Sequence, residues 1–88
     1  MKVAFRTQFA RDLKSVKDKR LLSRVREAIE GVEKANSLTD IPSLKKLKGA
    51  KNYFRLRIGD YRIGLALENN TLIFVRLLNR KEIYKYFP

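Results

Sequence analysis

The chain has 88 residues, 44% of them hydrophobic, which is enough for one domain with one modest core and too little for two. Its 21 Lys and Arg against 9 Asp and Glu give a formal net charge of +12, so the expected partner is polyanionic: a nucleic acid, an acidic membrane surface or an acidic protein. The absence of Cys and His excludes disulfides and thiolate chemistry, and it removes the commonest metal ligand and acid–base group.

The first half of the chain predicts a strand followed by two helices. Residues 2–6 alternate between apolar and polar, which is typical of a short strand. Thr7 is the expected N-cap of a helix whose apolar positions recur until about residue 17. Asp18 is the expected cap of a second helix, with an apolar stripe over residues 21–32. Together these helices present one apolar face, which needs a sheet to cover it.

The second half predicts strands. Residues 36–42 carry Ser, Thr, Asp and Pro, break the helical periodicity and are expected to link the helices to the sheet. The conformation of residues 44–49 is left open. Residues 53–58 and 61–67 flank Gly59-Asp60, which predicts a hairpin with a type II′ turn.

A last strand is expected from Leu72 to about Leu78, and residues 80–87 then form a terminal helical turn or tail. The predicted fold class is α+β, a single domain over residues 1–88 with element order βααβββ. Two N-terminal helices pack on one face of a mainly antiparallel four-stranded sheet. No apolar run approaches the roughly 18 residues of a membrane-spanning helix and no signal peptide follows Met1, so we expect a cytoplasmic protein without membrane contact.

The predicted hairpin register places three arginines on one face. Arg57 faces Arg62 and Arg55 faces Gly64, while the apolar residues of both strands face the helices. Like charges about 5 Å apart destabilise the pair unless an anion lies beside them, and a guanidinium clamps phosphate without releasing its proton. Gly64 and Ala66 are expected to leave room for that ligand. The alternative is that these arginines only keep an open sheet face soluble.

Two segments resemble the RelE/ParE superfamily of toxins, and its RelE-type members in particular. Leu47-Lys48-Gly49 followed by residues 53–63 resembles the family's basic hairpin, and residues 80–84 with Phe87-Pro88 resemble its closing motif. The resemblance covers nearly the whole chain. It implies a ribosome-dependent endoribonuclease that cuts messenger RNA in the decoding site without metal or cofactor. It also implies a cognate antitoxin, of acidic or amphipathic character.

The resemblance further implies roles for individual residues. Tyr84 would lie beside the reacting 2′-hydroxyl, which attacks the adjacent phosphate and leaves a cyclic phosphate and a 5′-hydroxyl. The residues implied to bind RNA phosphate are Arg55, Arg57, Arg62, Lys48 and Asn79, and those implied to act in catalysis are Arg62, Arg80, Lys81 and Tyr84.

The closing motif departs from the family at one position. Many relatives have His just before the Arg of this motif, where this chain has Asn79, and Asn cannot act as a general base. The candidates for handling the proton are Tyr84, then Lys81, then Glu82. Ribosomal positioning of the RNA and charge stabilisation can carry much of such a reaction without His.

Two other functions remain open at this point. A ParE-type relative would poison DNA gyrase, although the basic hairpin argues against it. A non-catalytic module would bind ribosome or RNA without cutting. For the tail, the structural alternative is that Ile83, Tyr84, Tyr86 and Phe87 pack on the core as an amphipathic end.

Overall fold

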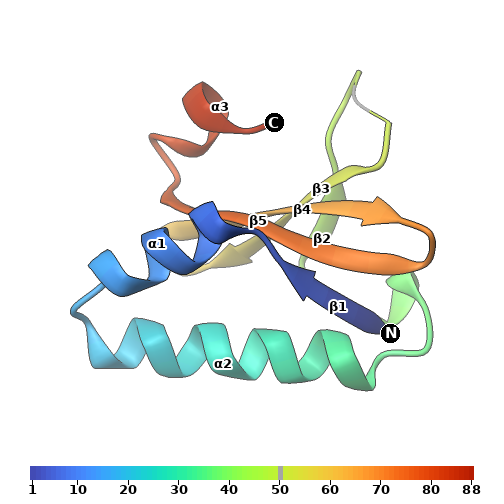
Figure 1. Ribbon diagram of the computed structural model, residues 1–88, viewed down its shortest axis with the longest axis horizontal. Helices are drawn as coiled ribbons and strands as arrows, with labels where there is room; N and C mark the ends of the chain where they lie inside the picture. Colours follow the sequence, from blue (N-terminus) through green and yellow to red (C-terminus); the bar gives the residue numbers. More distant parts are fainter. Residues whose placement is uncertain (50) are drawn as a thin grey trace.

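The helices of the molecule pack against a single five-stranded sheet (Figure 1). The computed structural model describes residues 1–49 and 51–88. In chain order the elements are β1 (Lys2–Phe5), α1 (Thr7–Ser15), α2 (Lys19–Lys34), a 3₁₀ helix (Leu38–Asp40), β2 (Leu44–Lys46), β3 (Tyr53–Ile58), β4 (Tyr61–Glu68), β5 (Thr71–Asn79) and α3 (Ile83–Tyr86). No helix in these two ranges is long and apolar enough to cross a membrane.

The strands are ordered β1-β5-β4-β3-β2, with β1 parallel to β5 and the other neighbours antiparallel. The predicted α+β class with a mainly antiparallel sheet is therefore confirmed. The predicted count of four strands is wrong, because residues 44–46 pair with β3 and form β2 at the sheet edge. In Figure 1, α2 runs beneath the sheet with α1 beside it, and α3 lies on the opposite side.

The helix boundaries follow from their caps. Asp18 caps α2 as predicted, because its carboxylate accepts hydrogen bonds from the amides of Arg20 (2.9 Å) and Leu21 (3.3 Å). The predicted Thr7 cap is wrong: Arg6 holds the N-cap position and Thr7 is already helical. The helix also ends two residues early, at Ser15, because the backbone must be extended again before the Asp18 cap.

Both hairpin turns depend on left-handed backbone. Gly59 has a φ of 57°, as the first central position of a type II′ turn requires, and Ile58 pairs with Tyr61 as predicted. Asn69 and Asn70 have φ values of 50° and 62° and connect β4 to β5 by a tight turn. Asn is one of the few residues that tolerates this region, so both turns fix the register of their strands.

The main core lies between the sheet and the two long helices. Phe9 of α1, Val25 and Val32 of α2, and Leu65 and Phe74 of the sheet are each at most 2% exposed. A second, smaller set of buried apolar residues belongs to the other side of the sheet, beneath α3. Its members are Ala66, Ile73, Ile83 and Phe87.

Candidate functional site

Four cations from three neighbouring strands share the face of the sheet that α1 and α2 leave open. Arg57 is opposite Arg62 and Arg55 is opposite Gly64, which confirms the predicted register. Lys45 of β2 is opposite Arg55 and extends the row across a third strand. Lys45, Arg55, Arg57 and Arg62, here called the cationic face, line a hollow of about 250 Å³ together with Ser43.

Lys45 is the member that sequence reasoning missed. The alternation of Leu44, which packs against the core, with exposed Lys45 was the available signal. Three residues are too short a run to establish a strand, and the partner strand lies about ten positions later in the chain. Pairing with β3 therefore determines which way Lys45 points.

Arg62 is the most enclosed of the four cations. It is 8% exposed, and its Nη1 donates hydrogen bonds to the carbonyl oxygens of Gly59 (3.0 Å) and Tyr61 (2.9 Å). Burial, followed by the positive charges of Arg57 and Arg55, lowers the pKa of its guanidinium. The side chain is thus held in place by the backbone of the hairpin. Even when buried, a guanidinium stays positively charged at neutral pH.

Within the part of the chain that the structure describes, no carboxylate forms an ion pair with the cationic face. The two ion pairs among residues 1–49 and 51–88 join Arg6 to Glu68 (3.5 Å) and Arg76 to Asp12 (2.8 Å), and neither includes the cationic face. Like charges on adjacent strands repel one another, and a bound anion relieves that repulsion. The geometry suits phosphate, which accepts paired hydrogen bonds from guanidinium groups.

The closing motif reaches the same region from α3 and the turn before it. The amide of Arg80 donates to the carbonyl oxygen of Asp60 (2.8 Å), which ties this turn to the β3–β4 hairpin. The Arg80 charge contributes to the lowered pKa of Arg62. Tyr84 is 63% exposed, and the guanidinium carbon of Arg55 lies 5.8 Å from the centre of its ring. The structure thus brings Arg80 and Tyr84 to the cationic face.

Asn79 has a structural task in this turn. Its Oδ1 accepts a hydrogen bond from the amide of Lys81 (3.0 Å), which leaves its NH₂ group as the part that can reach a phosphate. Lys81 is exposed and lines neither the 250 Å³ hollow nor its larger neighbour. Of the expected site residues, Lys81 and Asn79 are the two that no described side-chain contact or hollow brings to the cationic face.

Lys48 lies in the larger neighbouring hollow, of about 710 Å³. Lys45 and Arg55 line both hollows, so the two hollows adjoin at these residues. The other walls come from the segment before residue 50 and from the tail: Lys46, Leu47, Gly49, Tyr84, Phe87 and Pro88. Positive charge therefore extends from the hairpin arginines to Lys48.

The space above Gly64 is already filled. A Cβ on Gly64 would lie 2.7 Å from atoms of the Phe87 ring, so the expectation that Gly64 leaves room for a ligand is wrong. Phe87 is 4% exposed and meets Tyr53 edge to face at 5.6 Å between ring centres. Phe87 and Ile83 thus anchor the tail, whereas Tyr84 and Tyr86 are exposed.

The described residues contain no group of three or more His, Cys, Asp or Glu side chains that could hold a metal ion. The groups that the cationic face does present are guanidinium and ammonium groups, which can bind and neutralise an anion, and the phenol of Tyr84 lies beside them. Which of these groups acts in a reaction stays a prediction.

Comparison with known proteins connects this site to a family. The family model described as the ParE toxin of the type II toxin–antitoxin system parDE matches residues 3–84. Toxin RelE3 of Methanocaldococcus jannaschii is 46% identical over 89 aligned positions, which cover 100% of both chains.

Solved structures give the same result. The RelB-RelE antitoxin–toxin complex of Methanococcus jannaschii contains a chain with 42% identity and a TM-score of 0.82, covering 97% of this chain and 99% of that one. The RelBE2 toxin–antitoxin complex of Mycobacterium tuberculosis contains a chain with 26% identity and a TM-score of 0.68. The match covers 90% of this chain and 96% of that one. The YoeB dimer of Staphylococcus aureus, at 19% identity and a TM-score of 0.73, covers 91% and 97% and shares the fold.

Proposed function

The chain belongs to the RelE/ParE superfamily of toxins, and on this basis we propose that it is a ribosome-dependent endoribonuclease that cuts messenger RNA in the decoding site. The observation that carries the proposal is the cationic face, where Lys45, Arg55, Arg57 and Arg62 gather without a carboxylate partner in the described part of the chain. Such a surface suits a chain of phosphates. The proposal places the protein in the cytoplasm, where ribosomes and messenger RNA meet.

The reaction needs a phosphate held in place while its charge increases. The ribose 2′-oxygen attacks the adjacent phosphorus, the bond to the 5′-oxygen breaks, and the products are a 2′,3′-cyclic phosphate and a 5′-hydroxyl. One proton leaves the 2′-hydroxyl and one is delivered to the departing 5′-oxygen. Arg55, Arg57 and Arg62 neutralise the phosphate oxygens, whose negative charge grows in the transition state. This reaction requires neither a metal nor a cofactor.

Tyr84 is the protein group that we place beside the 2′-hydroxyl. Of the three candidates for handling the proton, it is the one that contacts the cationic face, through Arg55. Lys81 points from an exposed turn, and Glu82 serves that turn through its amide, which donates to the carbonyl oxygen of Asn79 (2.8 Å). Arg80 adds positive charge next to Arg62. Because His is absent, much of the rate enhancement would come from charge stabilisation and from the ribosome holding the RNA in line.

We also propose that a cognate antitoxin neutralises the protein. The RelE chain of Methanococcus jannaschii, which is similar to this one, was solved with its antitoxin RelB. A net charge of +12 favours an acidic partner, because complementary charge speeds association. The complex should survive nuclease treatment, and loss of the complex on that treatment would contradict direct protein–protein binding.

The decisive experiment adds purified protein to ribosomes programmed with a defined message and maps the 5′ ends that appear. Wild type should cut within the codon in the decoding site, and Arg62→Ala should cut at least tenfold more slowly, about the effect of losing one charged contact to the transition state. Arg26→Ala, at an exposed position of α2, removes the same charge elsewhere and should cut normally. Stable occupancy with uncut RNA would instead support a non-catalytic ribosome-binding module.

Gyrase inhibition is the second candidate, because the family model that matches residues 3–84 carries the ParE name. It predicts gyrase-linked DNA breaks on induction while protein synthesis initially continues. The cationic face favours the ribosomal target, since it presents to single-stranded RNA the cluster of arginines that phosphates require. Measuring translation and DNA breaks in the same induced culture separates the two functions.

A further inference from the structure

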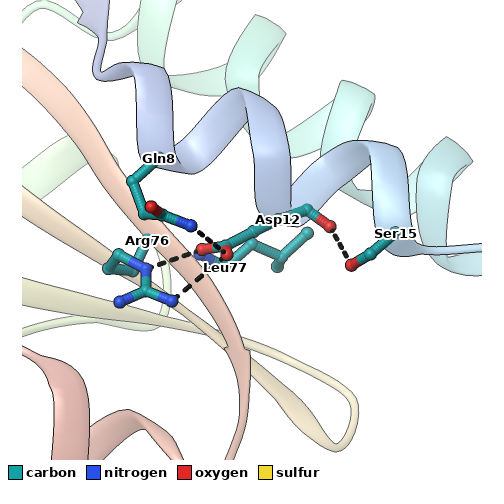
Figure 2. A network of polar contacts seen from close by, with 5 residues as sticks. All are labelled: Gln8, Asp12, Ser15, Arg76 and Leu77. Atoms are coloured by element: carbon teal, nitrogen blue, oxygen red, sulfur yellow. Dashed lines mark hydrogen bonds and ion pairs between the residues drawn. The ribbon is translucent and has the colours of Figure 1, made fainter.

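Arg76 of β5 differs from the cations of the cationic face because it has a carboxylate partner. Its Nε donates to Oδ2 of Asp12 (2.8 Å) and its Nη2 to Oδ1 of the same residue (3.2 Å) (Figure 2). Arg76 is opposite Gly64, so its strand position is on the side of the sheet that carries α3. It is therefore held in a fixed orientation between the first helix and the last.

Asp12 is itself held firmly. Its side chain is 9% exposed, and it also accepts hydrogen bonds from the amide of Leu77 (2.9 Å) and the side-chain amide of Gln8 (3.2 Å), as Figure 2 shows. The amide of Leu77 lies beyond the last residue of β5 that pairs with β1, which is Phe74. Asp12 thus satisfies an open backbone group of β5 and orients Arg76 with the same carboxylate.

The other neighbour of Arg76 is α3. The guanidinium carbon of Arg76 lies 5.9 Å from the centre of the Tyr86 ring, within the range of a cation–π contact. Tyr86 is 58% exposed, so this contact does not depend on burial in the core. Tyr84, two residues earlier on the same helix, contacts Arg55 of the cationic face.

A single helical turn cannot hold its shape alone, because helix nucleation is unfavourable and α3 has only four residues. Ile83 and Phe87 anchor its inner side in the small core over Gly64. Rotation about that anchor would carry Tyr84 away from Arg55. The contact between Arg76 and Tyr86 ties the turn to β5, whereas Tyr84 contacts Arg55 on β3, so the Arg76 contact is a second attachment that opposes this rotation.

We propose that Arg76, oriented by Asp12, is a positioning residue that holds α3 through Tyr86 and so keeps Tyr84 at the cationic face. The inference rests on the proposed function for the importance of Tyr84, and on the contacts alone for the holding of α3. Arg76 itself is not proposed to touch the RNA, because its guanidinium is bound to Asp12.

The test uses Tyr86, because an exposed residue can be changed without disturbing the core. Tyr86→Leu removes the aromatic face, and Tyr86→Phe keeps it and serves as the matched control. Hydrogen exchange measured by NMR at the Phe87 amide, which donates to the carbonyl oxygen of Ile83 (2.9 Å), reports whether α3 stays in place. Cleavage under single turnover on programmed ribosomes reports whether Tyr84 stays in place, and RNA affinity is measured alongside.

Tyr86→Leu should speed exchange at Phe87 and slow cleavage by about two- to fivefold, the range of one exposed cation–π contact, with RNA affinity unchanged. Tyr86→Phe should match wild type in all three measurements. Arg76→Met should have at least the effect of Tyr86→Leu on exchange and cleavage, because it also leaves the buried Asp12 carboxylate without its partner, and adding Tyr86→Leu to Arg76→Met should cause no further loss.

Equal exchange in Tyr86→Leu and wild type overturns the inference, and so does faster exchange without slower cleavage. If wild type cuts no RNA, the proposed function fails, while the exchange comparison still decides whether Arg76 holds α3.

Discussion

Arg57 of β3 and Arg62 of β4 lie directly opposite each other, and neither forms an ion pair within residues 1–49 or 51–88. Facing like charges destabilise a hairpin by an amount similar to that by which opposite charges stabilise one. The protein keeps this pair on its open face, where a phosphate chain can lie. Stability and the proposed RNA binding therefore make opposite demands on the same two residues.

The first prediction follows from that opposition. Arg57 is exposed, so Arg57→Gln should leave packing intact and raise the free energy of unfolding at low salt by about 0.2–1 kcal/mol. The same change should weaken binding of single-stranded RNA and reduce the slope of log affinity against log salt by about 0.7, the value for one phosphate contact. Urea unfolding and fluorescence anisotropy measure the two effects. A variant that loses stability and keeps the full salt slope would show that the pair is not an anion site.

A second prediction concerns the glycine beneath the tail. Gly64→Ala places a Cβ 2.7 Å from the Phe87 ring and must displace it, so we expect a loss of about 1–3 kcal/mol in stability together with loss of cleavage. Gly31→Ala is the matched control, because nothing lies within 4 Å of its Cβ and Ala favours the interior of α2. That control should gain about 0.5–1 kcal/mol. Thermal unfolding of both variants measures the difference; equal effects would contradict the packing of Phe87 on Gly64.

The residues that the sequence predicted well are those whose positions follow from a local signal. Gly59-Asp60 sets one turn, and antiparallel pairing then determines every partner along the hairpin, including Arg57 and Arg62. Asp18 likewise caps its helix through amides two and three residues ahead. In both cases the interacting groups are close in sequence, so pattern and geometry agree.

The residues that the sequence did not predict depend on contacts between distant segments. β2 exists because residues 44–46 find an edge of β3, and this edge places Lys45 in the site. Phe87 packs over Gly64, 23 residues earlier in the chain, in the small core under α3. Asp12 acquires its role because β1 ends at Phe5 and leaves the amide of Leu77 open. None of these contacts produces a periodic pattern of apolar and polar residues in the nearby sequence.

A third prediction uses the pH dependence of Asp12. Burial alone would raise the pKa of this carboxyl, but hydrogen bonds from Arg76, Leu77 and Gln8 outweigh burial and lower it below its ordinary value of 3.8. The stabilisation by Asp12 is therefore fully present above pH 3.8 and is lost as pH falls through the lower folded-state pKa. Asp12→Asn should cost about 1.5–3 kcal/mol at pH 7.

The cost of Asp12→Asn should shrink as pH falls below 3.8, because the unfolded wild type then binds a proton that the folded protein, with its lower pKa, does not. Urea unfolding at a series of pH values measures both proteins. Asp18→Asn is a useful comparison, because Asp18 is exposed and Asn is also a good N-cap, so this change should cost only a few tenths of a kcal/mol. A cost of Asp12→Asn that stays constant down to pH 2 would contradict the lowered pKa.

The last prediction concerns Asn79, the residue before Arg80 of the closing motif. Asn79 cannot accept a proton, whereas a His at this position could take the proton from the 2′-hydroxyl. Asn79→His should therefore speed cleavage on programmed ribosomes and make the rate rise with pH around the ordinary pKa of His, near 6.5. Wild type should show no such step, because it contains no His.

Asn79→Ala separates the second task of this residue: it removes the acceptor for the Lys81 amide and should loosen the turn before α3. If Asn79→His cleaves no faster than wild type at any pH while keeping its RNA affinity, then the Asn79 side chain does not lie where a general base is needed, and Tyr84 remains the group to test at the 2′-hydroxyl.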